Sequence, residues 1–194
     1  MILAISGSPR EKTTEYVLKQ AQKILSDLGY DMLQYNIRER EIGFCNHCDY
    51  CLVGNGCIIQ DDIQELYLLL PKADAIIMAS PVYNGGITAQ LKAVMDRTRA
   101  LFTSNQDLLR GKPGIAIAIG GDRSGGQELA IQQIHTYYII NGIIPVSGGV
   151  FGANLGASFY SRDTLEGIQA DEYGLKSLKK TLKRLTAYLE GLKN

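Results

Sequence analysis

Residues 1–14 read Met-Ile-Leu-Ala-Ile-Ser-Gly-Ser-Pro-Arg-Glu-Lys-Thr-Thr, and this stretch decides the fold class. An uncharged apolar run of strand length leads into a turn of glycine and hydroxyl residues, and a helical pattern follows. Parallel strands are uncharged and apolar throughout because helices cover both faces of their sheet. A turn that opens a helix presents free backbone N–H groups at the positive end of the helix dipole. The stretch therefore predicts a strand, an anion-binding turn and a helix in succession.

The rest of the chain repeats this alternation. Apolar strand-like runs follow at residues 31–35, 75–79, 113–119 and 143–150. Amphipathic segments of helical length lie at 14–28, 61–70, 88–102, 126–141 and 171–193. Five strands with intervening helices predict an α/β fold, a doubly wound five-stranded parallel sheet. For five strands numbered along the chain, the common order is 2-1-3-4-5, which is the flavodoxin-like arrangement.

Size and composition set further limits. The 194 residues predict a single domain over 1–194, and 45% hydrophobic residues are enough for its core. A formal charge of zero gives no basic face for nucleic acid. We see neither a signal peptide nor a membrane span, so we expect a soluble, cytoplasmic protein.

Ligands of such a sheet bind beyond the carboxyl ends of the strands, where the strand order reverses. In the loop after the first strand, Ser8, Thr13 and Thr14 can donate hydroxyl hydrogen bonds. Arg10 can bind a phosphate with two parallel hydrogen bonds. The alternative is an ordinary helix start that Thr13 or Thr14 caps.

Two further loops are predicted at the same edge. The loop after the third strand reads Ser80-Pro-Val-Tyr-Asn-Gly-Gly86, and the loop after the fourth begins with Gly120 and Gly121. Proline fixes a rigid turn, and glycines let the backbone approach a flat ligand closely. The alternatives are a rim aromatic without a ligand at Tyr83 and plain flexibility after the fourth strand.

All four cysteines lie within thirteen residues, in the long connection 36–60 that follows the second strand. Their spacing is C-x2-C-x2-C-x5-C, and the residues are Cys45, Cys48, Cys51 and Cys57. Bacterial ferredoxins place three cysteines two residues apart around a cubane cluster. We therefore predict a [4Fe–4S] loop at about 43–60. Structural zinc and redox-active thiols are the alternatives.

These motifs resemble known flavoproteins. Gly7-Ser-Pro-Arg10 followed by threonines, together with Ser80-Pro-Val-Tyr83, resembles the NADPH-dependent FMN reductase family. With the cysteine motif inserted after strand 2, the chain resembles the archaeal-type iron-sulfur flavoproteins. The resemblance implies one FMN and one cluster per subunit. It also implies a homodimer or homotetramer in which each flavin lies at a subunit boundary, near the cluster of a neighbour. Asn84 stands where relatives often have an aromatic residue, and an Asp-Arg pair is present as Asp96-Arg97.

The sequence thus predicts an electron-transfer flavoprotein with a ferredoxin-like donor. Ser8, Arg10, Thr13 and Thr14 are the expected phosphate ligands. The residues expected to frame the flavin ring are Pro81, Val82, Tyr83, Asn84, Gly85, Gly120 and Gly121. One alternative is an NAD(P)H-dependent FMN or quinone reductase whose cysteines bind zinc, and another is a redox sensor.

Overall fold

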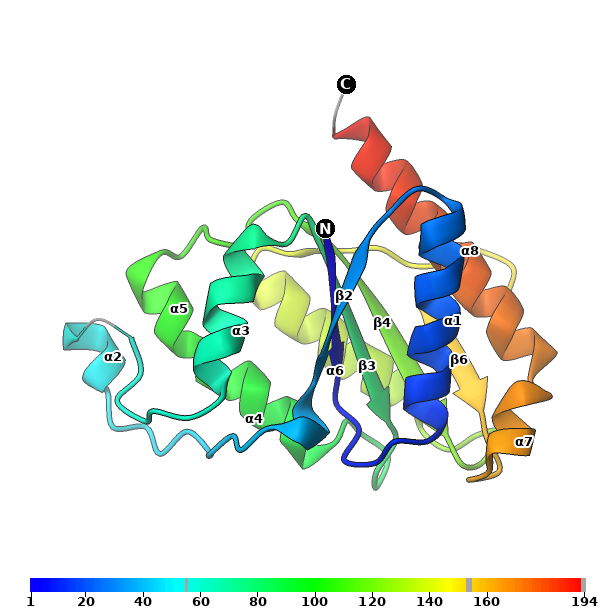
Figure 1. The fold of residues 1–194 in the computed structure, drawn as a ribbon, viewed down its shortest axis with the longest axis horizontal. Helices are drawn as coiled ribbons and strands as arrows, with labels where there is room; N and C mark the ends of the chain where they lie inside the picture. Colours follow the sequence, from blue (N-terminus) through cyan, green and yellow to red (C-terminus); the bar gives the residue numbers. More distant parts are fainter. Residues whose placement is uncertain (55, 153–154, 193–194) are drawn as a thin grey trace.

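The computed structural model describes residues 1–54, 56–152 and 155–192. A parallel sheet in the order β2-β1-β3-β4-β5 runs through its centre, and β6 also pairs with β4 (Figure 1). The strands are β1 (Ile2–Ser6), β2 (Met32–Asn36), β3 (Ala75–Pro81), β4 (Pro113–Gly120), β5 (Ile144–Pro145) and β6 (Ala157–Tyr160). The predicted doubly wound, flavodoxin-like sheet and its strand order are confirmed.

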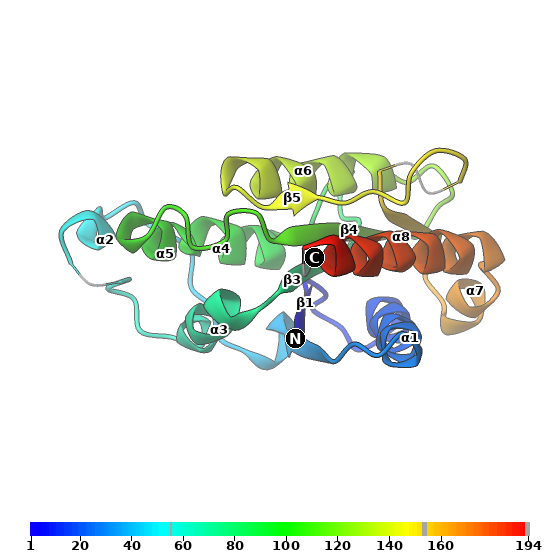
Figure 2. The same cartoon turned by 90° about the horizontal axis from the view of Figure 1, so that it is seen from above.

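Helices cover both faces of the sheet (Figure 2). They are α1 (Thr13–Asp27), α2 (Tyr50–Val53), α3 (Ile63–Leu69), α4 (Ala89–Arg97), α5 (Arg99–Ser104), α6 (Gln127–Ile140), α7 (Leu165–Gln169) and α8 (Glu172–Gly191), with 3-10 turns η1 (Ile37–Glu39) and η2 (Leu70–Lys72). In the part of the chain described, no helix is long and apolar enough to cross a membrane.

The two cores follow from the side-chain alternation of the strands. On β1, Ile2 and Ala4 belong to the core beneath α1 and α8, whereas Leu3 and Ile5 belong to the core beneath α3, α4 and α6. Each fully buried leucine or isoleucine side chain contributes about 1.5–3 kcal/mol. Strand β3 extends two residues beyond the carboxyl end of β1, because Ser6, the last residue of β1, pairs with Ala79 and β3 continues to Pro81.

The fifth position of the sheet differs from the prediction of one strand at 143–150. It holds two short strands in series, because Ile144 of β5 pairs with Pro113 and Ala157 of β6 pairs with Ile117. Pro145 ends β5 because it has no N–H for a ladder, and β6 lies outside the strand-like runs that the sequence predicted. Gly156 allows the chain to approach β4 again just before β6, because a methyl group at this position would lie 2.5 Å from the Ala116 carbonyl oxygen.

Two other predicted segments are subdivided. The single helix predicted at 88–102 is two helices that meet at Thr98. The Thr98 hydroxyl hydrogen-bonds the Met95 carbonyl at 2.7 Å and lies 3.0 Å from the Tyr137 hydroxyl. Such back-bonding by a threonine bends a helix. The connection 36–60 is not wholly irregular, because it contains η1 and α2.

Candidate functional site

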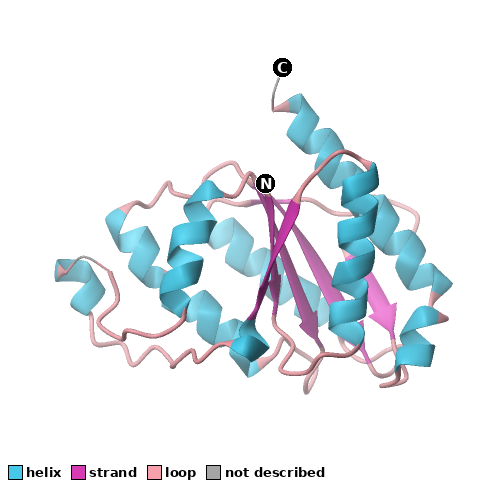
Figure 3. Cartoon of the chain, viewed as in Figure 1, coloured by secondary structure: helices cyan, strands magenta, loops and turns pink. Residues whose placement is uncertain are grey.

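The three predicted ligand loops meet at the carboxyl edge of the sheet (Figure 3). The buried Thr88 joins the first two: its hydroxyl donates to the Gly7 carbonyl at 2.7 Å, and its N–H donates to Ser80 Oγ at 3.1 Å. The second and third loops touch through their backbones, since a methyl group at Gly126 would lie 2.8 Å from Gly85 Cα. Thr88 was predicted only as the start of a helix, and its role in joining the loops was missed.

The first loop has the features of an anion site. Helix α1 begins at Thr13, and Lys12 at the preceding position makes no side-chain cap. The alternative in which Thr13 or Thr14 caps the helix is therefore wrong. Among the described residues, the buried Thr14 hydroxyl has no hydrogen-bond partner. Uncapped N–H groups and an unpartnered hydroxyl at a helix N-terminus are what a phosphate would satisfy.

Ser8 and Arg10 shape and border this loop. The Ser8 hydroxyl donates to the Arg10 carbonyl at 2.7 Å and accepts from the Arg10 N–H at 3.2 Å. Ser8 is therefore engaged in the turn that presents the uncapped amides. The Arg10 side chain is exposed, so its guanidinium is accessible to an incoming anion.

The second loop ends in a tight hairpin. Tyr83 N–H donates to the Gly86 carbonyl at 2.9 Å, and Gly86 N–H donates to the Tyr83 carbonyl at 3.1 Å. Both central residues have positive φ, 49° at Asn84 and 79° at Gly85, which defines the Asn-Gly turn of type I′. Asparagine suits this position, because it tolerates the left-handed conformation.

Buried and exposed residues divide along this second loop. Pro81 is buried at the end of β3, and the Val82 N–H donates to the Ile119 carbonyl at 2.9 Å. Tyr83 is 40% exposed at the hairpin. The ring of Tyr83 is therefore available to a ligand at the edge of the sheet.

The third loop is braced by Gln127, whose part the sequence did not reveal. This buried amide donates to the Asp122 carbonyl at 2.6 Å and to the Phe159 carbonyl at 3.1 Å, and it accepts from Gly125 N–H at 2.9 Å. A methyl group at Gly120 would lie 2.2 Å from Gln127 Nε2. Only glycine fits there, and the loop is pinned rather than merely flexible.

A fourth segment, 160–163, joins the site from the end of β6. Ser161 donates to the Gly120 carbonyl through its N–H at 2.9 Å and through its hydroxyl at 3.0 Å. A methyl group at Gly121 would lie 2.7 Å from the Asp163 carboxylate. The guanidiniums of Arg123 and Arg162 lie 5.4 and 5.6 Å from the Tyr160 ring. The only signal in the sequence was an aromatic residue in a glycine-rich connection.

The four cysteines line one small cavity. The cavity lies between the cysteine loop and the junction of α4 and α5, and Arg97 and Arg99 also line it. Cys45 and Cys48 are exposed, Cys51 and Cys57 are half-buried, and all four are free thiols. His47, between two of them, is exposed.

The described thiols do not converge as the ligands of a single metal ion do. Within the described ranges, no three Cys, His, Asp or Glu side chains are close enough together to hold one metal ion. Tetrahedral zinc, with Zn–S bonds of about 2.3 Å, needs such convergence. In a cubane each cysteine binds a different iron, so the sulfurs stand further apart. Four thiols around one cavity are the donor set that a cubane requires, one for each iron.

Charged side chains of both signs line the cavity: Arg97, Arg99, Asp49 and Asp96. Arg99 donates to Asp49 Oδ1 at 2.8 Å, and this hydrogen bond raises the pKa of Arg99, with the nearby Cys51 and Cys45 adding to the effect.

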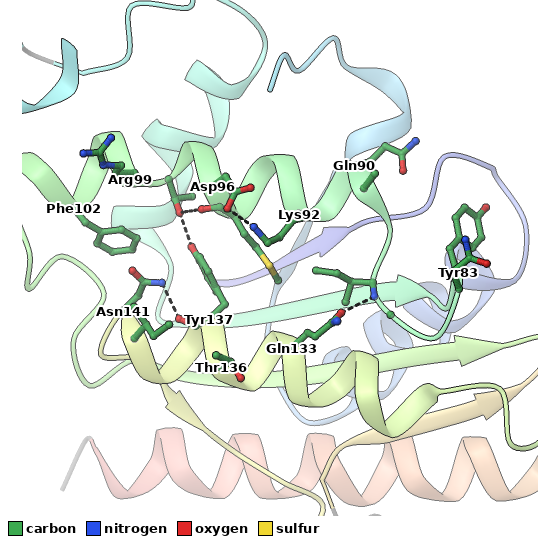
Figure 4. A pocket seen from close by; sticks show the side chains of 17 residues that line it. Tyr83, Gln90, Lys92, Asp96, Arg99, Phe102, Gln133, Thr136, Tyr137 and Asn141 are labelled. Carbon is green, nitrogen blue, oxygen red and sulfur yellow. Dashed lines mark hydrogen bonds and ion pairs between the residues drawn. The ribbon is translucent and has the colours of Figure 1, made fainter. Parts of the chain in front are cut away.

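A groove of about 1,110 Å³ connects the two regions along α4 and α6 (Figure 4). Figure 4 shows Tyr83 at one end and Arg99 with Phe102 at the other. Asp96 and Arg99 line both this groove and the cysteine cavity. The second ligand loop and the cysteine loop therefore border one continuous surface.

Comparison with known proteins agrees with this geometry. The model of the NADPH-dependent FMN reductase family matches residues 1–157. An iron-sulfur flavoprotein of Archaeoglobus fulgidus is 60% identical over 98% of this chain and 97% of its own length. One of Methanocaldococcus jannaschii is 47% identical over 97% of this chain and 96% of its own.

The solved structure of RosB, with a bound 8-demethyl-8-formylriboflavin-5'-phosphate intermediate, superposes with a TM-score of 0.78. It covers 99% of this chain and 79% of RosB at 14% identity, which supports the fold alone. The coverage and identity of the relatives above decide the family. The chain belongs to the NADPH-dependent FMN reductase family and, within it, to the iron-sulfur flavoproteins.

Proposed function

We propose that this flavoprotein passes electrons between a [4Fe–4S] cluster on the cysteine loop and FMN at the carboxyl edge of the sheet. The observation that carries the proposal is the cavity lined by all four cysteines, which opens beside the groove leading to Tyr83. FMN supplies one- or two-electron chemistry and a cubane supplies one-electron chemistry, so together they connect the two kinds of carrier. A ferredoxin-like protein is the proposed donor.

The phosphate of FMN is assigned to the first loop. The unpartnered Thr14 hydroxyl and the uncapped N–H groups of α1 would donate to it. Arg10 would close the site from solvent, and Ser8 holds the turn that aims the amides. Thr13, as the first residue of α1, contributes its N–H and its hydroxyl.

The flavin ring is assigned to the second and third loops. Its expected neighbours are Pro81, Val82, Tyr83, Asn84, Gly85, Gly120 and Gly121, as the sequence predicted. The rigid Asn-Gly turn and the braced third loop support this assignment, because neither needs to reorganise when a flat ligand binds. Cys45, Cys48, Cys51 and Cys57 are the proposed iron ligands, and a reducing cytoplasm would keep them as thiols.

A homodimer or homotetramer is proposed as the working form. Within one chain, the nine-residue helix α4, which is about 13 Å long, lies between the Tyr83 loop and the cysteine cavity. The groove between α4 and α6 is mostly apolar, and Ile140 on its wall is 76% exposed. A second copy seated there would cover this surface and would bring a second cysteine loop toward the flavin. Ile140→Glu should then yield monomers in light scattering, whereas an unchanged mass would count against this interface.

Cofactor analysis tests the assignment directly. The protein is purified without oxygen, and iron, sulfide, zinc and FMN are measured per chain. We expect FMN, together with iron and sulfide in equal amounts, and zinc without iron or sulfide would refute the cluster. Cys51→Ser should abolish the cluster while FMN is retained, and equal loss of both would mean that the loop serves folding. Arg10→Ala should weaken FMN binding, and unchanged affinity would remove its phosphate role.

The second candidate is an NAD(P)H-dependent FMN or quinone reductase. The open groove beside Tyr83 favours it, because hydride transfer requires access to one face of the flavin. Rapid bleaching of the flavin by NADPH alone would support this activity. Bleaching only with reduced ferredoxin would support the electron-transfer role.

A further inference from the structure

Arg97 holds both ends of the cysteine loop. Its Nη1 donates to the Gly43 carbonyl at 2.9 Å, two residues before the first cysteine. Its Nη2 donates to the Ile59 carbonyl at 3.0 Å, two residues after the last cysteine. The same guanidinium binds Asp61 with two parallel hydrogen bonds of 2.8 and 3.1 Å. One side chain thus joins the entry of the loop to its exit.

The surroundings fix this guanidinium in place. Asp61 also accepts the Gly43 N–H at 2.8 Å, so both backbone groups of Gly43 are bound. The Arg97 carbonyl accepts the Tyr67 hydroxyl at 2.6 Å. Burial by itself lowers the pKa of Arg97, but the Asp61 hydrogen bond and the nearby Cys57 raise it above its ordinary value. Arg97 is therefore charged while its side chain is only 1% exposed.

One donor of this guanidinium has no acceptor. In the described chain, Arg97 Nε is buried and without a hydrogen-bond partner, and Arg97 lines the cavity of the four cysteines. An unsatisfied buried donor is costly, the more so on a charged group. The acceptors that a filled cavity would supply are the sulfur atoms of thiolates and of a cluster.

We propose that Arg97 is a positioning residue for the iron-sulfur cluster, which closes the cysteine loop before the cluster binds and donates Nε–H to a sulfur afterwards. The role rests on the proposed function, since it requires a cluster. Reduction adds negative charge to a cluster that four thiolates already make negative. A buried cation hydrogen-bonded to sulfur stabilises the reduced form and raises the reduction potential.

Two comparisons separate the parts of this role. Arg97→Lys keeps a positive charge but loses the planar fork that reaches Gly43 and Ile59 together. Arg99→Gln removes a charge from the same cavity without touching the clamp, because the Arg99 guanidinium bonds the Asp49 side chain. Arg97→Gln removes both charge and clamp.

The first measurement uses the iron-free proteins. Hydrogen exchange is followed at the Gly43 N–H, which donates to the Asp61 carboxylate that Arg97 binds. We expect protection in the wild type and in Arg99→Gln, and at least tenfold faster exchange in Arg97→Gln and Arg97→Lys. Equal protection in all four proteins would overturn the clamp.

The second measurement uses anaerobically reconstituted proteins, with iron and sulfide per chain and a potentiometric titration followed by electron paramagnetic resonance. Arg97→Gln should favour the oxidised cluster about tenfold, which corresponds to about 59 mV for a one-electron couple, and Arg97→Lys should shift less. If Arg97→Gln does not fold, Arg97→Lys still decides, through its exchange and its iron content. If the wild type holds a cluster and every Arg97 variant has the same reduction potential and the same iron content as the wild type, the role of Arg97 alone is overturned. A wild type without iron would overturn the proposed function as well.

Discussion

Replacing Thr14 by valine should change two measurable quantities in opposite directions. The variant keeps the shape of the side chain and removes the hydroxyl that is buried and unpartnered in the ligand-free protein. An unsatisfied buried polar group costs about 1–3 kcal/mol, so Thr14→Val should stabilise the FMN-free protein by about 1 kcal/mol or more. A hydrogen bond to a charged group contributes about 1.5–3 kcal/mol. Its loss should weaken FMN binding by about 10- to 150-fold.

The assay pairs urea unfolding of the FMN-free protein with a fluorescence titration of FMN. Thr181→Val is the matched control, because Thr181 is also fully buried but its hydroxyl already donates to the Ser177 carbonyl at 2.8 Å. This control should lose about 1 kcal/mol of stability and leave FMN affinity unchanged. If Thr14→Val destabilises the FMN-free protein or binds FMN normally, the phosphate does not meet this hydroxyl and the reasoning fails.

Three further predictions concern the loops and α6. In urea unfolding, Gly126→Ala should lower the free energy of unfolding by about 2–4 kcal/mol, and Gly85→Ala by only about 1 kcal/mol. Both glycines have positive φ, but only at Gly126 would the added methyl group lie 2.8 Å from a backbone atom. Gln127→Ala should cost about 2–4 kcal/mol and weaken FMN binding, because three hydrogen bonds of the third loop are lost; unchanged affinity would separate that loop from the flavin. Burial lowers the pKa of His135, so the unfolded chain binds more protons below about pH 6.5. Stability should fall with pH below this value, and His135→Phe should flatten the fall.

The fold was predictable because it depends on patterns that are local in sequence. The uncharged runs at 75–79 and 113–119 mark buried strands without reference to any neighbour. The fifth position was not predictable in the same way. Ile144 and Ala157 pair with the same strand, β4, at successive positions along it, although a connecting segment separates them in the chain. Only pairing with β4 reveals that both segments belong to the same edge.

For the candidate site too, only the features that are local in sequence could be predicted. Residue types and spacing were enough to predict a role for the cysteines, the hydroxyls of the first loop and the glycines of the later loops. The residues that hold these groups in place were not identifiable, because their partners are distant in sequence. Thr88 bonds Gly7, Gln127 bonds Phe159, and Arg97 bonds Gly43. The sequence around each of these three residues contains no pattern that predicts its contact.

Helix α4 links the two proposed cofactor sites mechanically. Thr88 caps its first turn by accepting the Leu91 N–H at 3.2 Å, and the same hydroxyl holds the first ligand loop through Gly7. Arg97, its last residue, holds the cysteine loop. The spacing between flavin loops and cysteine cavity is therefore set by a rigid rod of nine residues rather than by a flexible connection. A rod fixes the separation within one chain, so any shorter path for electrons has to come from a second copy. Variation of the exposed face of α4–α6 should then alter electron transfer without altering either cofactor's binding.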